Sequence, residues 1–165
     1  MTLSEILSNE FANEAKTTRR MLERLPADKL DWRPHAKSFT AIGLASHIVE
    51  CLNLTDTILN QDEFDIDPAT YPRYQAASID DLIEQFDARV ARGQRAFASV
   101  TDADLARPWS FKVMGRERWS KPKVVVMRDF TLSHLIHHRG QLSVYLRLLD
   151  VPVPGAYGPT ADEGR

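Results

Sequence analysis

Three of the five histidines in the chain lie in the stretch HLIHHRGQ, residues 134–141, within a segment that has the apolar periodicity of a long helix. Residues four apart on a helix lie nearly in line, about 6 Å apart along the axis, so His134 and His138 can bind one ion. Both fall on the apolar stripe of the segment, whereas His137 falls at its edge. Buried imidazoles need partners for both ring nitrogens, and a metal ion is one such partner. The spacing therefore predicts part of a metal site.

A third imidazole comes from a second segment with helical periodicity. His47 lies on its apolar stripe together with Thr40, Leu44, Cys51, Leu54 and Ile58. Three neutral imidazoles suit zinc, nickel, copper or ferrous iron, and they leave a coordination position for water or substrate. We predict a divalent metal ion, zinc or nickel, bound by His47, His134 and His138. The alternative is that each histidine hydrogen-bonds a polar neighbour in the core.

The neighbours of these histidines leave further alternatives open. Cys51 follows His47 by one helical turn and could close a structural zinc site as a fourth ligand, although we favour a small core residue. Glu50 could orient His47 or accept a proton, and we slightly favour a surface charge. His137 and His35 are expected not to bind the metal. The sequence identifies no catalytic residue.

Four segments must position these side chains. Apolar residues recur at helical spacing over residues 2–25, 39–59, 78–100 and 120–149. The first and third begin with capping patterns, Thr2 with Glu5 and Ser78 with Asp81, whereas Ser38 is the expected cap of the second. The connections are longer than the two to eight residues common in helical bundles. The predicted fold is all-α, a four-helix bundle with long crossover connections.

The third connection contains the most distinctive local sequence. RPWSFKVMGRERW predicts a short hairpin that turns at Met114–Gly115. Residues 112–123, KVMGRERWSKPK, hold five basic residues and one acidic residue. A solvated loop is the favoured interpretation, and an anion-binding lip is the alternative. A length of 165 residues is suited to a single domain spanning 1–165.

Composition excludes several classes of protein. A net charge of −2 lacks the basic excess of a general nucleic-acid-binding protein, so we expect no nucleic-acid partner. The apolar runs are shorter than the roughly 20 residues that cross a bilayer, and the amino terminus lacks the pattern of a signal peptide. One cysteine cannot form an internal disulfide. We therefore expect a cytoplasmic protein without membrane contact.

Two stretches resemble the DinB family, also called the DinB/YfiT-like metalloenzymes. They are DFTLSHLIHHRGQLSVYLRLLDVPVPGAYGPTADE and LDWRPHAKSFTAIGLASHIVE. The resemblance implies a four-helix bundle with long crossovers, often a homodimer. It also implies a divalent metal held by one histidine of the second helix and an H-x-x-x-H pair of the last. His47, His134 and His138 match those positions.

The resemblance also implies a class of chemistry. The family includes transferases and isomerases that use bacillithiol, mycothiol or glutathione, together with members induced by DNA damage. We therefore expect a metal-dependent thiol S-transferase that acts on small electrophiles and uses a low-molecular-weight thiol. Two alternatives stay open. One is a non-catalytic, metal-stabilised protein of the stress or DNA-damage response, and the other is a metal-dependent hydrolase, for which the sequence offers no evident general base.

Overall fold

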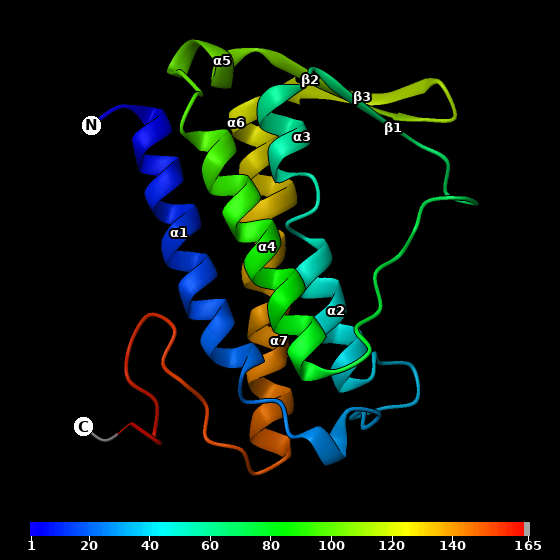
Figure 1. Ribbon diagram of the computed structural model, residues 1–165, viewed down its shortest axis with the longest axis vertical. Helices are drawn as coiled ribbons and strands as arrows, with labels where there is room; N and C mark the ends of the chain where they lie inside the picture. Colours follow the sequence, from blue (N-terminus) through cyan, green and yellow to red (C-terminus); the bar gives the residue numbers. More distant parts are fainter. Residues whose placement is uncertain (164–165) are drawn as a thin grey trace.

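The computed structural model describes residues 1–163, and most of them lie in helices. Four helices run along the long axis of the molecule (Figure 1): α1 (Leu3–Leu22), α2 (Ala41–Glu50), α4 (Ile79–Phe97) and α7 (His134–Leu148). Helix α1 packs against α4 and α7, and α2 packs against the same two helices. Among residues 1–163, no helix is long and apolar enough to cross a membrane.

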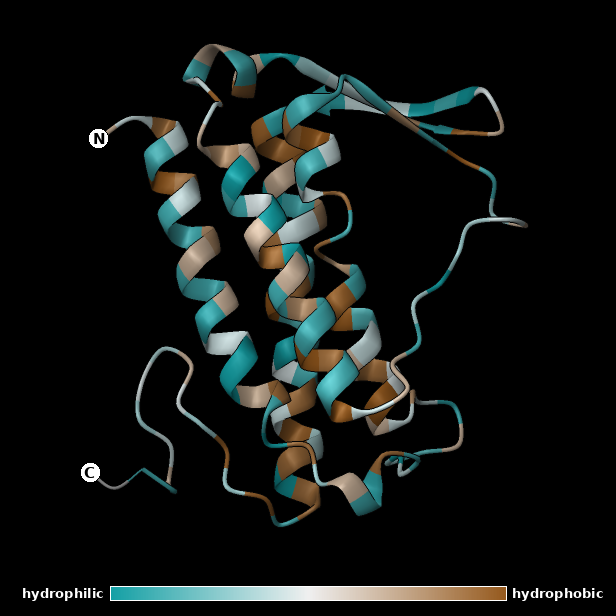
Figure 2. Ribbon diagram, in the orientation of Figure 1, coloured by the Kyte–Doolittle hydropathy of each residue, from teal (hydrophilic) through white to brown (hydrophobic). Residues whose placement is uncertain are grey.

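The core lies between these four helices. Phe11 of α1, Leu44 and Ile48 of α2, Phe86 of α4 and Leu142 of α7 are all fully buried. Figure 2 shows that α2 is largely hydrophobic, whereas α1 and α4 expose hydrophilic residues over much of their length. This difference follows from the sequence, because a surface helix needs only one apolar stripe and a covered helix needs more.

The predicted starts of the first and third helices are confirmed. The Thr2 hydroxyl accepts a hydrogen bond from the Glu5 backbone, and the Glu5 carboxylate accepts one from the Thr2 backbone, which completes a capping box. The Ser78 hydroxyl accepts from the backbone of Asp81 at the start of α4. Helix α1 ends at Leu22, before the expected end at residue 25, and a 3-10 turn, Ala27–Lys29, follows.

The helix predicted over residues 39–59 is interrupted. Thr40, and not Ser38, caps α2, and a turn separates α2 from α3 (Thr55–Asn60). The interruption has a tertiary cause. At the turn, Arg89 of α4 donates to the side-chain oxygen of Asn53 at 2.5 Å, and Arg92 donates to its backbone carbonyl at 3.3 Å. Arg92 thus donates to a backbone carbonyl that would accept an internal hydrogen bond in a continuous helix, and Arg89 holds the Asn53 side chain.

Gly93 of α4 allows this close packing. A Cβ atom at position 93 would lie 2.9 Å from the side chain of Thr55 and 2.7 Å from the ring of Phe11. Such distances are too short for a methyl group, so α3 and α1 approach α4 closely only because residue 93 is glycine.

A three-stranded sheet lies at one end of the helices (Figure 1). β1 (Glu63–Ile66) pairs in parallel with β2 (Pro108–Val113), which pairs antiparallel with β3 (Arg116–Pro122). The predicted hairpin turn is confirmed, since Met114 and Gly115 have φ angles of 51° and 76°. The short helix α5 (Asp102–Ala106) precedes β2. The all-α prediction is therefore corrected to a mostly helical fold with a small sheet, because β1 is completed by a partner more than 40 residues away.

The last helical segment begins later than predicted and is not uniform. Ser120 belongs to β3, where it pairs with Ser110, so helix α6 (Lys123–Val126) starts only after Pro122. A π-helical stretch, Met127–Ser133, then connects α6 to α7. Such stretches are rare and occur frequently at functional sites. This one ends directly before His134, the first residue of α7.

Candidate metal centre

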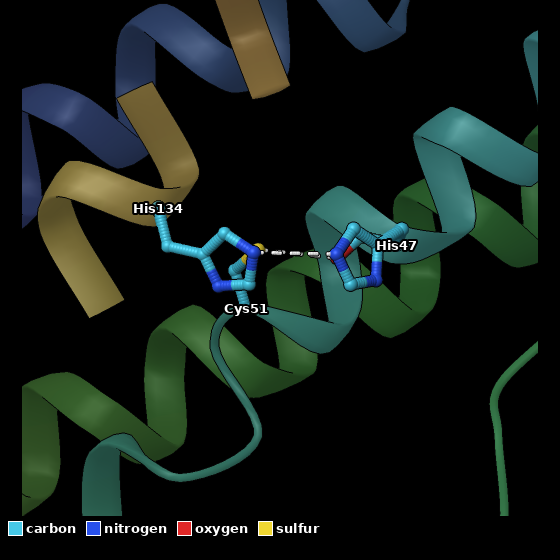
Figure 3. Close-up of side chains that lie close together, drawn as sticks. All are labelled: His47, Cys51 and His134. Carbon is cyan, nitrogen blue, oxygen red and sulfur yellow. Dashed lines mark hydrogen bonds between the residues drawn. The ribbon is translucent and has the colours of Figure 1, made fainter. Parts of the chain in front are cut away.

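The structure brings all three predicted ligands together. Nε2 of His47 on α2 lies 3.3 Å from Nε2 of His134 on α7, and the dashed line in Figure 3 joins the two rings. The ring centroid of His138 lies 4.5 Å from that of His47 and 4.7 Å from that of His134. Packing of α2 against α7 creates this cluster from residues 87 positions apart in the sequence.

The spacing of these nitrogens suits a metal ion. Zinc–nitrogen bonds of about 2.0–2.1 Å at tetrahedral angles place two ligating nitrogens about 3.3–3.4 Å apart. The observed 3.3 Å between the two Nε2 atoms agrees with that value. His47, Cys51 and His134 form a group that could hold an ion, since their ligand atoms all lie within 4.8 Å of one another (Figure 3).

Two polar side chains orient the imidazoles. Oε2 of Glu50 lies 3.2 Å from Nδ1 of His47, and Oε1 of Gln141 lies 2.7 Å from Nδ1 of His138. Each oxygen accepts the Nδ1 proton, which leaves the Nε2 lone pair free for a metal. Because the Glu50 side chain is only 14% exposed, its interpretation as a surface charge is wrong.

Gln141 was not predicted from the sequence, although a signal for it exists. Glu50 follows His47 by three residues, and Gln141 follows His138 by three residues. Residues three apart are neighbours on a helix surface. In both helices, therefore, the histidine ring is oriented by a side-chain oxygen of the residue three positions later. The same spacing on two helices is the pattern that would have identified it.

Burial favours the neutral form of two of these imidazoles, His134 and His138. It lowers the pKa of His134, and the nearby His47 ring adds to this effect, while a hydrogen bond with the Phe130 backbone opposes it. Burial also lowers the pKa of His138, to about 4, with the Gln141 hydrogen bond opposing and the neighbouring imidazoles adding to the decrease. Neutral imidazole is the form that binds metals, so both rings are ready to bind at neutral pH.

Cys51 differs from the histidines in its protonation. Its Sγ donates a hydrogen bond to the His47 carbonyl at 3.2 Å. Burial raises the pKa of the thiol to about 12, and the charge of Glu50 contributes. A thiol in this environment stays protonated at neutral pH, whereas a cysteine ligand must be a thiolate. In the metal-free protein, Cys51 therefore lies near the centre as a protonated thiol.

The two remaining histidines are both exposed, and the ring centroid of His137 lies 4.8 Å from that of His138. His137 is exposed, and its Nε2 lies 3.1 Å from the side-chain nitrogen of Gln141. His35 is also exposed and accepts a hydrogen bond from the backbone of Lys37.

A cavity of about 280 Å³ opens beside the histidines, which is at the small end of the range for ligand pockets. Its walls come from α2, β1, β2, the π-helical stretch and the segment between β1 and α4. The lining residues are His47, Glu50, Cys51, Leu54, Phe64, Ile66, Tyr71, Arg73, Phe111, Phe130 and His134. The candidate centre thus faces a space in which a small molecule could bind.

The lowered pKa values predict a pH-dependent stability of the metal-free protein. Below pH 6.5 the unfolded chain takes up a proton at His138 that the folded chain, with a pKa of about 4, does not. The free energy of unfolding should therefore fall as the pH drops from 6.5 towards 4. We expect the melting temperature of the EDTA-treated protein to fall by about 3 °C or more between neutral and moderately acidic pH.

Thermal unfolding of the unaltered protein and of His138→Gln at pH 7.5 and pH 5.0 measures this effect. The glutamine variant should lose less stability on acidification, because it has no imidazole to protonate. Equal losses in the two proteins would show that His138 is not the group responsible.

These observations define a mostly helical protein with a histidine-lined centre between two of its helices. Comparisons with known proteins agree with this class. The DinB superfamily model matches residues 10–142. The chain belongs to the DinB superfamily. The search among curated proteins found no significant match.

Three solved structures share the fold. A DinB-like protein from Bacillus cereus has a TM-score of 0.73 at 24% identity, covering 93% of this chain and 97% of its own. A DinB-like protein from Bacillus subtilis has a TM-score of 0.68 at 18% identity, with coverages of 96% and 99%. A structure described as a DinB family member, from Exiguobacterium sibiricum, has a TM-score of 0.66 at 19% identity, with coverages of 98% and 98%. At these identities the likeness concerns the fold.

Proposed function

We propose that the protein is a metal-dependent thiol S-transferase that acts on small electrophiles. The observation that carries this proposal is the cavity of about 280 Å³ lined by His47 and His134, because a purely structural metal site has no need of an adjoining pocket. In this proposal, α1, α2, α4 and α7 form the four-helix bundle and the chain is a homodimer, as the resemblance to the family implies. The proposed cytoplasmic location rests on the sequence composition.

The proposed ligands of the ion are His47, His134 and His138, and the proposed metal is zinc or nickel. The centroids of the three rings lie 4.5–5.1 Å apart. Nδ1 of His47 hydrogen-bonds the Glu50 carboxylate, and Nδ1 of His138 hydrogen-bonds the Gln141 side-chain oxygen. Cys51 is proposed to be a lining residue and not a ligand, since its Sγ donates a hydrogen bond to the His47 carbonyl at 3.2 Å. Three protein ligands leave a position for a substrate atom.

When bound, the ion would stabilise a thiolate as a further ligand and so raise the reactive fraction of a thiol at neutral pH. The side chains of the chain supply the remaining functions. Glu50 and Gln141 hold the rings of His47 and His138 in a fixed tautomer. Phe111 and Phe130, whose rings lie 5.9 Å apart, form an apolar wall that excludes water from the electrophile.

The structure offers little support for hydrolysis. A hydrolase needs a general base that can take a proton from water. Glu50 is the only carboxylate among the residues that line the pocket, and both of its oxygens are engaged, Oε2 with His47 Nδ1 and Oε1 with the backbone N–H of Tyr74. This arrangement favours an orienting role over proton transfer.

A thiol panel tests the transferase proposal. Zinc-loaded and nickel-loaded protein would be offered bacillithiol, mycothiol, glutathione, coenzyme A and cysteine, each with a chromogenic aryl electrophile. We expect at least one thiol to react about tenfold or more faster than the uncatalysed rate, because the site raises the thiolate fraction. The EDTA-treated protein and His134→Ala should show no acceleration.

If no thiol reacts faster than in buffer, or if His134→Ala matches the loaded protein, the transferase proposal fails. A non-catalytic, metal-stabilised protein of the stress response would then be the better account. In the same preparation, sedimentation at micromolar concentration would test the proposed homodimer.

A further inference from the structure

The cavity beside the histidines is apolar over most of its wall. Phe64 and Ile66 of β1, Phe111 of β2 and Phe130 of the π-helical stretch all line it. Aromatic and branched side chains of this kind favour the flat or branched apolar part of a small ligand. The three-stranded sheet therefore contributes directly to the pocket, and not only to the stability of one end of the molecule.

One cationic side chain interrupts this apolar lining. Arg73 is the only lysine or arginine among the lining residues, and within residues 1–163 it makes neither an ion pair nor a side-chain hydrogen bond. A guanidinium offers five N–H donors in a fork that matches the two oxygens of a carboxylate. Arg73 thus presents free donors at the edge of an apolar pocket.

The segment that carries Arg73 is held in place by α2. The Tyr74 N–H donates to Oε1 of Glu50 at 2.8 Å, and the Ala76 N–H donates to the Ser46 hydroxyl at 3.0 Å. The guanidinium of Arg89 also stacks on the Tyr74 ring at 4.8 Å. Glu50 therefore connects the ring of a proposed metal ligand, His47, with the backbone next to Arg73. The fold consequently fixes the backbone that carries Arg73 relative to His47.

The basic residues expected to form an anion-binding lip are mostly occupied elsewhere. Lys112 pairs with Glu63 at 2.5 Å, and Lys121 pairs with Asp129 at 3.0 Å. Lys123 is buried and donates to the Leu59 carbonyl. Arg116 and Arg118 are not among the residues that line the pocket. Residues 112–123 are therefore poor candidates for binding an anion at the pocket, and Arg73 is the better candidate for that function.

We propose that Arg73 is a specificity-determining residue that binds the carboxylate of a small substrate, while the apolar part of that substrate lies against Phe64, Phe111 and Phe130. This proposal rests on the proposed function, since it names a substrate class for the same site. The carboxylate can belong to the electrophile or to the thiol, and the chemistry recognised by Arg73 is the same. A neutral substrate would leave the guanidinium unpaired at the pocket and should bind more weakly.

Binding of small probes tests the proposal without turnover. Phenylacetate and its neutral counterpart phenylacetamide would be titrated into zinc-loaded and EDTA-treated protein, with affinity measured by calorimetry and NMR. S-methylglutathione, whose sulfur is blocked, would be titrated in the same way to represent the carboxylates of a thiol. We expect Arg73→Gln to weaken the binding of phenylacetate, of S-methylglutathione or of both about tenfold, because a charge-assisted bidentate contact is lost.

Matched variants separate this effect from a general change in charge. Arg73→Lys should retain part of the affinity, and phenylacetamide should bind equally to the unaltered protein and to Arg73→Gln. Arg118→Gln, which removes an exposed arginine of β3 outside the pocket lining, should leave the binding of every probe unchanged. If Arg73→Gln binds phenylacetate more weakly, the carboxylate belongs to the electrophile. If it binds S-methylglutathione more weakly, the carboxylate belongs to the thiol.

The proposal is overturned if Arg73→Gln binds both acidic probes as tightly as the unaltered protein. It is also overturned if EDTA treatment abolishes binding while Arg73→Gln has no effect, since the carboxylate would then bind the metal. Binding to the EDTA-treated protein requires neither a metal nor a reaction. The binding result can therefore be interpreted even if the transferase proposal fails.

Discussion

Alanine at position 47, 134 or 138 is expected to lower the affinity of the protein for zinc at least about a hundredfold, because each substitution removes one of three proposed ligands. Competition with a chromophoric zinc chelator at pH 7.5 measures the dissociation constants. Glu50→Gln should have a smaller effect, about tenfold, since it weakens only the hydrogen bond at 3.2 Å that orients His47.

Two control variants test the assignment of ligands. His137→Ala should bind zinc as tightly as the unaltered protein, because His137 is exposed and directs its Nε2 to Gln141. Cys51→Ser should lower the affinity less than fivefold if the thiol stays protonated beside the site. A hundredfold loss in Cys51→Ser together with little loss in His138→Ala would make Cys51, and not His138, the third ligand.

Removal of Glu14 is expected to destabilise the protein by about 3–5 kcal/mol, the usual cost of leaving a buried charge without its partner. Arg139 of α7 is 2% exposed and forms an ion pair with Glu14 of α1. The Tyr157 hydroxyl donates to Glu14 at 3.0 Å and lies 2.7 Å from Nη2 of Arg139, so the carboxy-terminal segment joins the same cluster. Urea unfolding of Glu14→Ala, followed by circular dichroism, measures the change in free energy.

Three further variants show whether burial of the Glu14–Arg139 pair causes the expected loss of stability. Glu23→Ala breaks an exposed ion pair with Arg19 and should cost less than about 1 kcal/mol. Tyr157→Phe should cost about 1 kcal/mol, the usual value of one hydrogen bond. The double variant Glu14→Leu with Arg139→Met should be more stable than Glu14→Ala, because it leaves no charge unpaired. If Glu14→Ala is no less stable than Glu23→Ala, the buried pair does not stabilise the packing of α1 on α7.

Local signals in the sequence were sufficient for several features. The capping patterns at Thr2 and Ser78 and the turn at Met114–Gly115 depend on contacts within a few residues, and all three are confirmed. The spacing of His134 and His138 on one face is likewise a property of a single helix. Membership of the family also follows from sequence, since the superfamily model matches residues 10–142.

Features that depend on distant partners were not predicted. β1 exists because β2 pairs with it, and α2 ends where Arg89 and Arg92 of α4 hydrogen-bond Asn53. The local sequence pattern identifies neither of these partners. It stays helical through the end of α2, and at β1 it favours neither a helix nor a strand. The start of the last helix was misplaced for the same reason, because Ser120 pairs in β3.

The candidate metal centre likewise has features that the local sequence determines and features that depend on tertiary packing. Residue type and helical spacing by themselves determined which imidazoles point into the core, because a helix repeats every 3.6 residues whatever surrounds it. Only the tertiary structure decided that Nε2 of His47 and Nε2 of His134 lie 3.3 Å apart, that Glu50 is partly buried beside His47, and that Arg73 lines the pocket without an ion pair among residues 1–163. Those facts depend on how α2, α7 and the segment before α4 pack, and packing joins residues that the sequence keeps far apart.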